Sequence, residues 1–225
     1  MGDGSGPYRL IVVTTIGAQI PCNLGPRKDD VLDLKARKKV APILDPLARG
    51  LGRVGLTPTA VTLIGLAVTF AGAAMIALSY LTVGAVVAGV GVFLDALDGP
   101  LARARGTATV RGAFIDTMSD RFGEIAIWVG LAVWLRDDAV SLLLCTLALA
   151  ASLLVPYVRA KAESWGAEGK GGWMGRAERM ILALSGILVA GVFPQVLTPV
   201  LVVFVVLVGL TVAQRIRRTW QQLPG

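Results

Sequence analysis

Six long runs of apolar residues, separated by short polar turns, dominate the chain from residue 57 to residue 214. The runs cover about 57–79, 82–104, 112–135, 139–160, 178–193 and 196–214. A helix needs about 20 apolar residues to cross the core of a bilayer, and most of these runs approach or exceed that length. A lipid-exposed backbone must satisfy its own hydrogen bonds, which favours helices. The pattern therefore predicts an all-α integral membrane protein with six transmembrane helices.

A segment of mixed polarity precedes the first apolar run. Residues 31–52 combine Lys and Arg with Leu, Ile and Val at helical spacing, which predicts an amphipathic helix on the cytoplasmic membrane surface. Residues 1–31 are rich in Gly and Pro around one apolar run that is too short to cross a bilayer. The chain is thus expected to consist of an N-terminal extension of unknown role (1–31) and one membrane domain (32–225).

Basic residues lie mostly on one side of the predicted membrane domain. The turns at 79–81 and 193–195 contain no Lys or Arg and the turn at 136–138 contains one, whereas the other turns and the surface helix contain many. Basic residues concentrate in cytoplasmic loops, so the asymmetry predicts a multi-pass protein of the cell membrane with both termini in the cytoplasm. The net charge of +7 is explained by this topology, and we expect no nucleic-acid partner.

The composition limits the chemistry that the chain can perform. It has no His, and its two Cys, Cys22 and Cys145, lie far apart without the spacing of metal ligands. The usual general base and the commonest ligand of transition metals are therefore missing. Acid–base chemistry would have to use carboxylates, and a bound metal would be a hard cation that prefers oxygen ligands.

Four aspartates interrupt the apolar pattern where the second run ends and the third begins. Asp95 and Asp98 share one helical face, as do Asp116 and Asp120. Asp95 lies 14 residues after the outer turn at Leu81, and Asp120 lies 16 before the outer turn at 136–138. At 1.5 Å per residue, both are about 20–25 Å from the outer surface, so two antiparallel helices bring four carboxylates to one level.

Charge at this depth is costly and needs compensation. Two divalent ions, Mg²⁺ or Mn²⁺, would balance the four carboxylates and form the usual clamp for phosphoryl chemistry. A purely structural alternative pairs the aspartates with Arg103, Arg111 and Arg121. A functional alternative of another class is a cation transporter that uses intramembrane carboxylates as an ion path. Gly99, Ala102 and Gly112, which lie between the pairs, suit either close helix packing or a bulky diphosphate ligand.

The aspartates belong to a longer motif that resembles the signature of the CDP-alcohol phosphotransferases. Eight fixed positions fall within 26 residues, in the order Asp95-x2-Asp98-Gly99-x2-Ala102-Arg103-x8-Gly112-x3-Asp116-x3-Asp120. The resemblance extends over about residues 35–220. It implies that the chain transfers a phosphatidyl group from a CDP-lipid, such as CDP-diacylglycerol, to an alcohol hydroxyl and releases CMP. It also implies a homodimer embedded in membrane lipid.

The same resemblance implies roles for individual residues. Two Mg²⁺ ions, or Mn²⁺, would be held by Asp95, Asp98, Asp116 and Asp120, and Asp120 would also take the proton of the attacking hydroxyl. The CDP-lipid would be bound by Thr62, Asp98, Gly99, Ala102, Arg103 and Thr109. The first span of the family often begins with Pro-Asp-x-x-Thr; here Thr59 stands where Asp is common.

Within the family, the chain is similar to the phosphatidylinositol phosphate synthases and their archaeal-lipid counterparts. The resemblance lies in the stretches YVRAKAE, RAER, IDTMSDR and AQRIRRTW. It implies inositol 1-phosphate as the acceptor, with its phosphate held by Arg159, Arg179 and Arg215. An arginine binds phosphate through two parallel hydrogen bonds, which suits a phosphorylated alcohol. Glycerol 3-phosphate or another inositol compound remains the alternative acceptor for the same chemistry.

Overall fold

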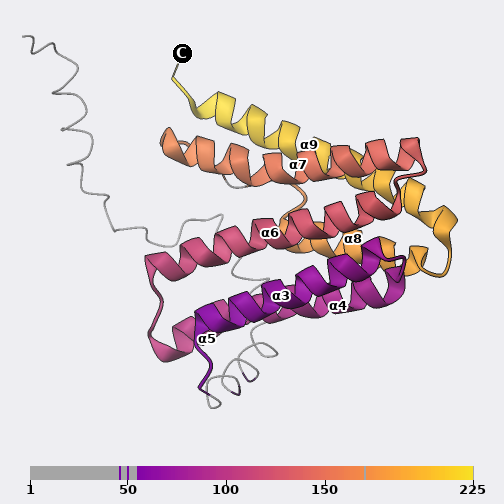
Figure 1. The fold of residues 1–225 in the computed structure, drawn as a ribbon. Helices are drawn as coiled ribbons and strands as arrows, with labels where there is room; N and C mark the ends of the chain where they lie inside the picture. The colour runs from indigo at the N-terminus through magenta and orange to yellow at the C-terminus, as the bar shows by residue number, and fades with distance from the viewer. Residues whose placement is uncertain (1–45, 47–49, 51–54, 170, 225) are drawn as a thin grey trace, which may run out of the picture. The chain divides into compact units, whose positions relative to one another are not determined.

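The computed structural model describes Pro46, Gly50, residues 55–169 and residues 171–224. The predicted extension and most of the predicted surface helix lie outside these residues. In the described part, all regular structure is helical, as predicted (Figure 1). The helices are α3 (Pro58–Ala77), α4 (Leu81–Asp95), α5 (Asp98–Arg105), α6 (Val110–Trp134), α7 (Ala139–Ser164), α8 (Arg176–Ala190), the short 3₁₀ turn η1 (Pro194–Val196) and α9 (Leu197–Gln222).

Four of the helical segments are long and apolar enough to cross a membrane. They are Pro58–Ala77, Leu81–Arg105, Ala139–Ser164 and Pro194–Gln222, with 20, 25, 26 and 29 residues. Helix α6 has 25 residues, but its first half contains the charged residues of the motif. Helix α8 has only 15 residues, a length of about 22 Å. The chain therefore folds as a multi-pass membrane protein with at least these four membrane-capable segments.

Helices α3 and α4 pack closely because small residues line both of them. A Cβ atom added to Gly72 of α3 would lie 2.7 Å from Ala88 Cα, and one added to Gly84 of α4 would lie 2.8 Å from Ile76 N. Lipid tails are as apolar as the side chains, so helices in membranes associate through such close backbone packing. Helix α6 packs against α3, and α7 packs against α9 along much of its length (Figure 1).

The second apolar run, predicted as one helix over 82–104, contains a break. Helix α4 ends at Asp95, Ala96 and Leu97 form a turn, and α5 begins at Asp98. The break has a cause in the sequence: Pro100 has no N–H to donate, and its ring clashes with the carbonyl four residues earlier, that of Ala96. Two of the four aspartates therefore lie at the break itself, which ends one helix and begins the next.

Candidate active site

Three carboxylates gather at the break between α4 and α5. Asp95 is the last residue of α4, Asp98 is the first of α5, and Asp116 lies on α6. Each contributes a carboxylate oxygen, and these oxygens all lie within 4.8 Å of one another. Asp95 and Asp98 are buried, and Asp95 Oδ1 has no hydrogen-bond partner among the described residues. A buried, all-oxygen group with an unpartnered atom fits a hard divalent cation such as Mg²⁺ or Mn²⁺.

The fourth predicted ligand, Asp120, lies one turn further along α6 and pairs with an arginine. Arg176 Nη2 lies 2.5 Å from Asp120 Oδ1 and 3.2 Å from Asp95 Oδ2. Arg176 is the first residue of α8 and was not among the predicted site residues. The sequence offers two signals for it: Arg176 begins the stretch RAER, and it lies three residues before Arg179, which places both on one face of the helix.

A further buried carboxylate, which the sequence analysis did not predict, lies one turn beyond Asp120 on α6. Glu124 of α6 is only 1% exposed. It is 2.7 Å from Arg121 Nη1 and 3.3 Å from Arg179 Nε. Of the arginines considered as structural partners of the aspartates, Arg121 is 3.8 Å from Asp120. Ion pairs therefore run from Asp120 through Arg121 to Glu124, and from Glu124 to Arg179 of α8. Pairing of this kind makes the burial of charge tolerable.

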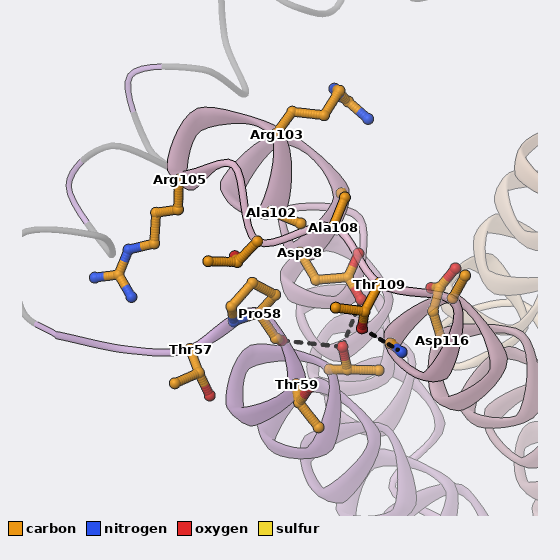
Figure 2. A pocket seen from close by; sticks show the side chains of 15 residues that line it. Thr57, Pro58, Thr59, Asp98, Ala102, Arg103, Arg105, Ala108, Thr109 and Asp116 are labelled. Atoms are coloured by element: carbon orange, nitrogen blue, oxygen red, sulfur yellow. Dashed lines mark hydrogen bonds between the residues drawn. The ribbon is translucent and has the colours of Figure 1, made fainter.

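A pocket of about 400 Å³ opens beside the aspartates, between the starts of α3 and α6 and helix α5 (Figure 2). Every residue predicted to bind the CDP-lipid lines it: Thr62, Asp98, Gly99, Ala102, Arg103 and Thr109. Thr59 and Asp116 line it as well. Thr62, which is buried, hydrogen-bonds through Oγ1 to Asp98 Oδ2, so α3 is tied directly to the carboxylate group.

Two helix starts form walls of the pocket. Thr57 caps α3, since its side chain accepts from Ala60 N at 3.2 Å, and Thr109 caps α6, since its side chain accepts from Gly112 N at 3.0 Å. The N-termini of helices carry partial positive charge and free N–H groups, which favour phosphate. A Cβ added to Gly99 would meet Arg103 Nη1 at 3.4 Å, an ordinary contact distance, so Gly99 and this guanidinium lie side by side at the pocket. The pocket is thus suited to a nucleoside diphosphate.

The three predicted acceptor arginines lie on three different helices. Arg159 of α7 donates from Nε to Glu163 Oε1 at 2.8 Å. Arg179 of α8 is 2% exposed and pairs with Glu124, whereas Arg215 of α9 donates to backbone carbonyls. The positive charges of Arg159 and Arg179 and the negative charge of Glu163 all act on Arg215. Like charges brought together in this way favour the binding of an anion.

A family model for CDP-alcohol phosphatidyltransferase matches residues 55–213. The phosphatidylinositol phosphate synthase of Mycobacterium tuberculosis (strain ATCC 25618 / H37Rv) is 36% identical over 208 residues, which are 86% of this chain and 93% of the relative. The archaetidylinositol phosphate synthase of Methanothermobacter thermautotrophicus is 36% identical over 189 residues, which are 83% of this chain and 93% of that protein.

Solved structures give the same result. The Mycobacterium tuberculosis phosphatidylinositol phosphate synthase with CDP-DAG bound matches with a TM-score of 0.74 and 36% identity, over 80% of this chain and 94% of that one. The same enzyme in complex with manganese and citrate matches with a TM-score of 0.74 and 35% identity, over 79% of this chain and 88% of that one. The chain is therefore a member of the CDP-alcohol phosphatidyltransferase family.

Proposed function

We propose that the chain is a phosphatidylinositol phosphate synthase, which transfers the phosphatidyl group of CDP-diacylglycerol to a hydroxyl of inositol 1-phosphate and releases CMP. One observation carries the proposal: the clustered aspartates border the pocket on one side and contact a basic residue on the other. Asp98 and Asp116 line the nucleotide-sized pocket, whereas Asp95 and Asp120 contact Arg176 at the start of α8. A donor and an acceptor that each carry phosphate can therefore meet at the carboxylates.

The residues around the carboxylates have distinct tasks in this reaction. Asp95, Asp98, Asp116 and Asp120 would hold two divalent ions, which when bound neutralise charge on the reacting phosphates. Gly99, Arg103 and the capped start of α6 bind the CDP part in the pocket. Much of the rate enhancement in phosphoryl transfer comes from such positioning and charge stabilisation.

Asp120 is the proposed proton acceptor. The hydroxyl oxygen of the acceptor forms a bond to the β-phosphorus of the CDP-lipid, the bond from that phosphorus to CMP breaks, and the hydroxyl proton passes to Asp120. The chain has no His for this task, and a general base must lie within hydrogen-bond reach of the proton it takes. Asp120 is favoured for this role because it contacts Arg176, which lies on the same helix as the proposed acceptor residue Arg179.

Arg159, Arg179 and Arg215 are the proposed holders of the acceptor phosphate. The charges of Arg159 and Arg179 both act on Arg215, which supports an anionic acceptor, and a neutral alcohol would need no such group of arginines. Glycerol 3-phosphate is the second candidate, because its phosphate would satisfy the same arginines.

We further propose six membrane spans in a cell-membrane homodimer with both termini in the cytoplasm. The domain division at residue 32 and the amphipathic surface helix belong to the same proposal. If α6 and α8 also cross the membrane, then Arg105, Lys161 and Arg217 all fall on one side, as the positive-inside rule requires. Helix α6 has 25 residues and is long enough, and its carboxylates Asp120 and Glu124 are paired with Arg176 and Arg179.

The test is CMP release by the purified protein in detergent with CDP-diacylglycerol, Mg²⁺ and a panel of acceptors. We expect inositol 1-phosphate to support release, and free inositol and serine not to support it. CMP release with glycerol 3-phosphate but not with inositol 1-phosphate would overturn the proposal that inositol 1-phosphate is the acceptor. Divalent-ion flux in proteoliposomes without any nucleotide product would instead support the transporter alternative.

A further inference from the structure

We propose that the loop of residues 168–174, between α7 and α8, is a positioning element that aims Arg159 and Arg215 at the acceptor phosphate. The loop is built from Glu168, Gly169, Gly171, Gly172, Trp173 and Met174 around Lys170, which lies outside the described residues. The inference rests on the proposed function, because it is that function which makes these arginines an acceptor site. It assigns a role to a segment that the family motif does not include.

The loop holds Arg215 through backbone carbonyls. Arg215 Nε donates to Gly171 O at 2.8 Å, and its Nη1 donates to Val155 O of α7 at 2.9 Å. The guanidinium thereby links α9, the loop and α7, and the two bonds fix its plane. Its remaining N–H groups are left for a ligand.

The nature of these partners matters for the charge of Arg215. A carbonyl orients a guanidinium without neutralising it, whereas a carboxylate would cancel its charge. Several other arginines are each paired with a carboxylate: Arg121, Arg159, Arg176 and Arg179. Arg215 forms no ion pair with any carboxylate in the described part of the chain, although the charge of Glu163, which pairs with Arg159, also acts on it. Its charge is therefore less neutralised than that of the paired arginines and can act on an anionic substrate.

The loop is fastened to α9 on both sides of Gly171. Met174 N donates to Thr211 Oγ1 at 3.2 Å, and both residues are buried. On the other side, Glu168 N donates to Gln222 Oε1 at 2.7 Å, and Gln222 Nε2 donates back to Glu168 O at 3.3 Å. The loop therefore follows α9 from Thr211 to Gln222 and passes Arg215 on the way.

Glycines allow the loop to come this close. A Cβ added to the buried Gly169 would lie 2.8 Å from the Cα of Arg159 and 2.8 Å from its Cγ. Gly172 has φ +98°, which other residues rarely adopt, and its added Cβ would lie 2.7 Å from Thr211 Cγ2 and 3.6 Å from Arg215 Nε. A side chain at either position would push the loop away from an arginine of the acceptor site.

The experiment compares Gly172→Ala with Gly209→Ala, a control on the same helix as Arg215, where an added Cβ meets no atom within 4 Å. We expect Gly172→Ala to raise the KM for inositol 1-phosphate about tenfold or more, because small misplacements of binding groups have such effects. The KM for CDP-diacylglycerol should stay unchanged, and kcat at saturating acceptor should change little. Gly209→Ala should match the unaltered protein.

A second variant separates positioning from loss of folding. Adding Thr211→Ser to Gly172→Ala removes the methyl group that the new Cβ would meet and keeps the hydroxyl that binds Met174 N. We expect this pair of changes to recover part of the acceptor KM. An unchanged acceptor KM in Gly172→Ala, or an equal rise in both KM values, would overturn the proposal.

Anion binding gives a readout that does not depend on turnover. Inorganic phosphate should raise the unfolding temperature of the unaltered protein in detergent, and the rise should be lost in Gly172→Ala and kept in Gly209→Ala. If the unaltered protein shows this rise but no CMP release with inositol 1-phosphate, the proposed function fails and the loop's role in holding an anion stands. An equal rise in Gly172→Ala, or no rise in the unaltered protein, overturns the role of the loop.

Discussion

Arg176 Nη2 lies 2.5 Å from Asp120 Oδ1, so the first residue of α8 places a positive charge against the proposed catalytic carboxylate. The same nitrogen lies 3.2 Å from Asp95 Oδ2. One guanidinium thereby bridges carboxylates from α4 and α6 in a position where divalent ions would also neutralise them. The arginine and the proposed ions would therefore compete for the same negative charge.

Replacing this arginine should strengthen metal binding. In Arg176→Gln the carboxylates lose a nearby cation, so the Mg²⁺ or Mn²⁺ concentration for half-maximal thermal stabilisation should fall at least about threefold; opposite charges at this range interact by about 1–4 kcal/mol near a protein surface. Arg217→Gln, an exposed change on α9, is the control. Thermal unfolding in detergent, from metal-free buffer upward, measures the effect. Weaker metal binding in Arg176→Gln would contradict the competition.

Asp120→Asn should abolish turnover without unfolding the protein. The amide has nearly the shape of the carboxylate but cannot accept the hydroxyl proton, and loss of a general base costs about 10²–10⁴-fold in rate. CMP release measures the loss, and the unfolding temperature in detergent verifies the fold. Asp138→Asn changes an exposed carboxylate at the start of α7 and should leave the rate unaltered. Near-normal turnover in Asp120→Asn would remove the proposed base.

The sequence contains enough information to place the helices and to group three of the aspartates. The depth of Asp95 and Asp120 could be predicted because each lies at a known distance from an outer turn, and helix rise converts residue number into depth; both contact Arg176 in the structure. The apolar pattern continues through Ala96, so it did not predict the break there. Pro100 is the residue in the sequence that indicates the break. Asp98 still lies close to Asp95 and Asp116, because the break comprises only Ala96 and Leu97.

The partners of the aspartates could not be predicted in the same way. Arg103, Arg111 and Arg121 lie near the motif in the sequence, whereas Arg176, which pairs with Asp95 and Asp120, follows Asp120 by 56 residues. Arginines are expected at every cytoplasmic helix end, so a basic residue there does not indicate which one turns inward. Which arginine lies against the aspartates depends on how α8 packs against α4 and α9. The local pattern of apolar and polar residues does not determine that packing.

Removing the Thr62 hydroxyl should weaken binding of the CDP-lipid. Thr62→Val keeps the shape of the side chain but leaves the bonded oxygen of Asp98 without its donor. A hydrogen bond to a charged group contributes about 1.5–3 kcal/mol, so the KM for CDP-diacylglycerol should rise about tenfold. Thr62→Ser, which retains the hydroxyl, should stay close to the unaltered value. Equal KM values in Thr62→Val and Thr62→Ser would show that the hydroxyl has no part in the site.

Gly65→Ala should displace Asp95 and destabilise the pairing of α3 with α4. An added Cβ would lie 2.8 Å from Gly91 O and 2.9 Å from Asp95 N, both backbone atoms that cannot rotate away. Overpacking of this kind costs about 1–3 kcal/mol, so the unfolding temperature and the CMP release should both fall. Gly209→Ala, where no atom lies within 4 Å, should change neither. Full activity in Gly65→Ala would mean that the helices can separate without moving the carboxylate.

The turn between α6 and α7 should make stability depend on pH through Asp138. Hydrogen bonds from the Ser141 side chain, from Ser141 N and from Val140 N lower the pKa of this exposed carboxyl below its ordinary value. A lowered folded-state pKa stabilises the protein above the unfolded pKa of about 3.9, and the stabilisation is lost as pH falls through the folded pKa. Asp138→Asn keeps a good N-cap but cannot titrate. Between about pH 6 and about pH 3, the unfolding temperature should therefore fall further for the unaltered protein than for Asp138→Asn. An equal fall for both proteins would show that the cap does not depend on the charge.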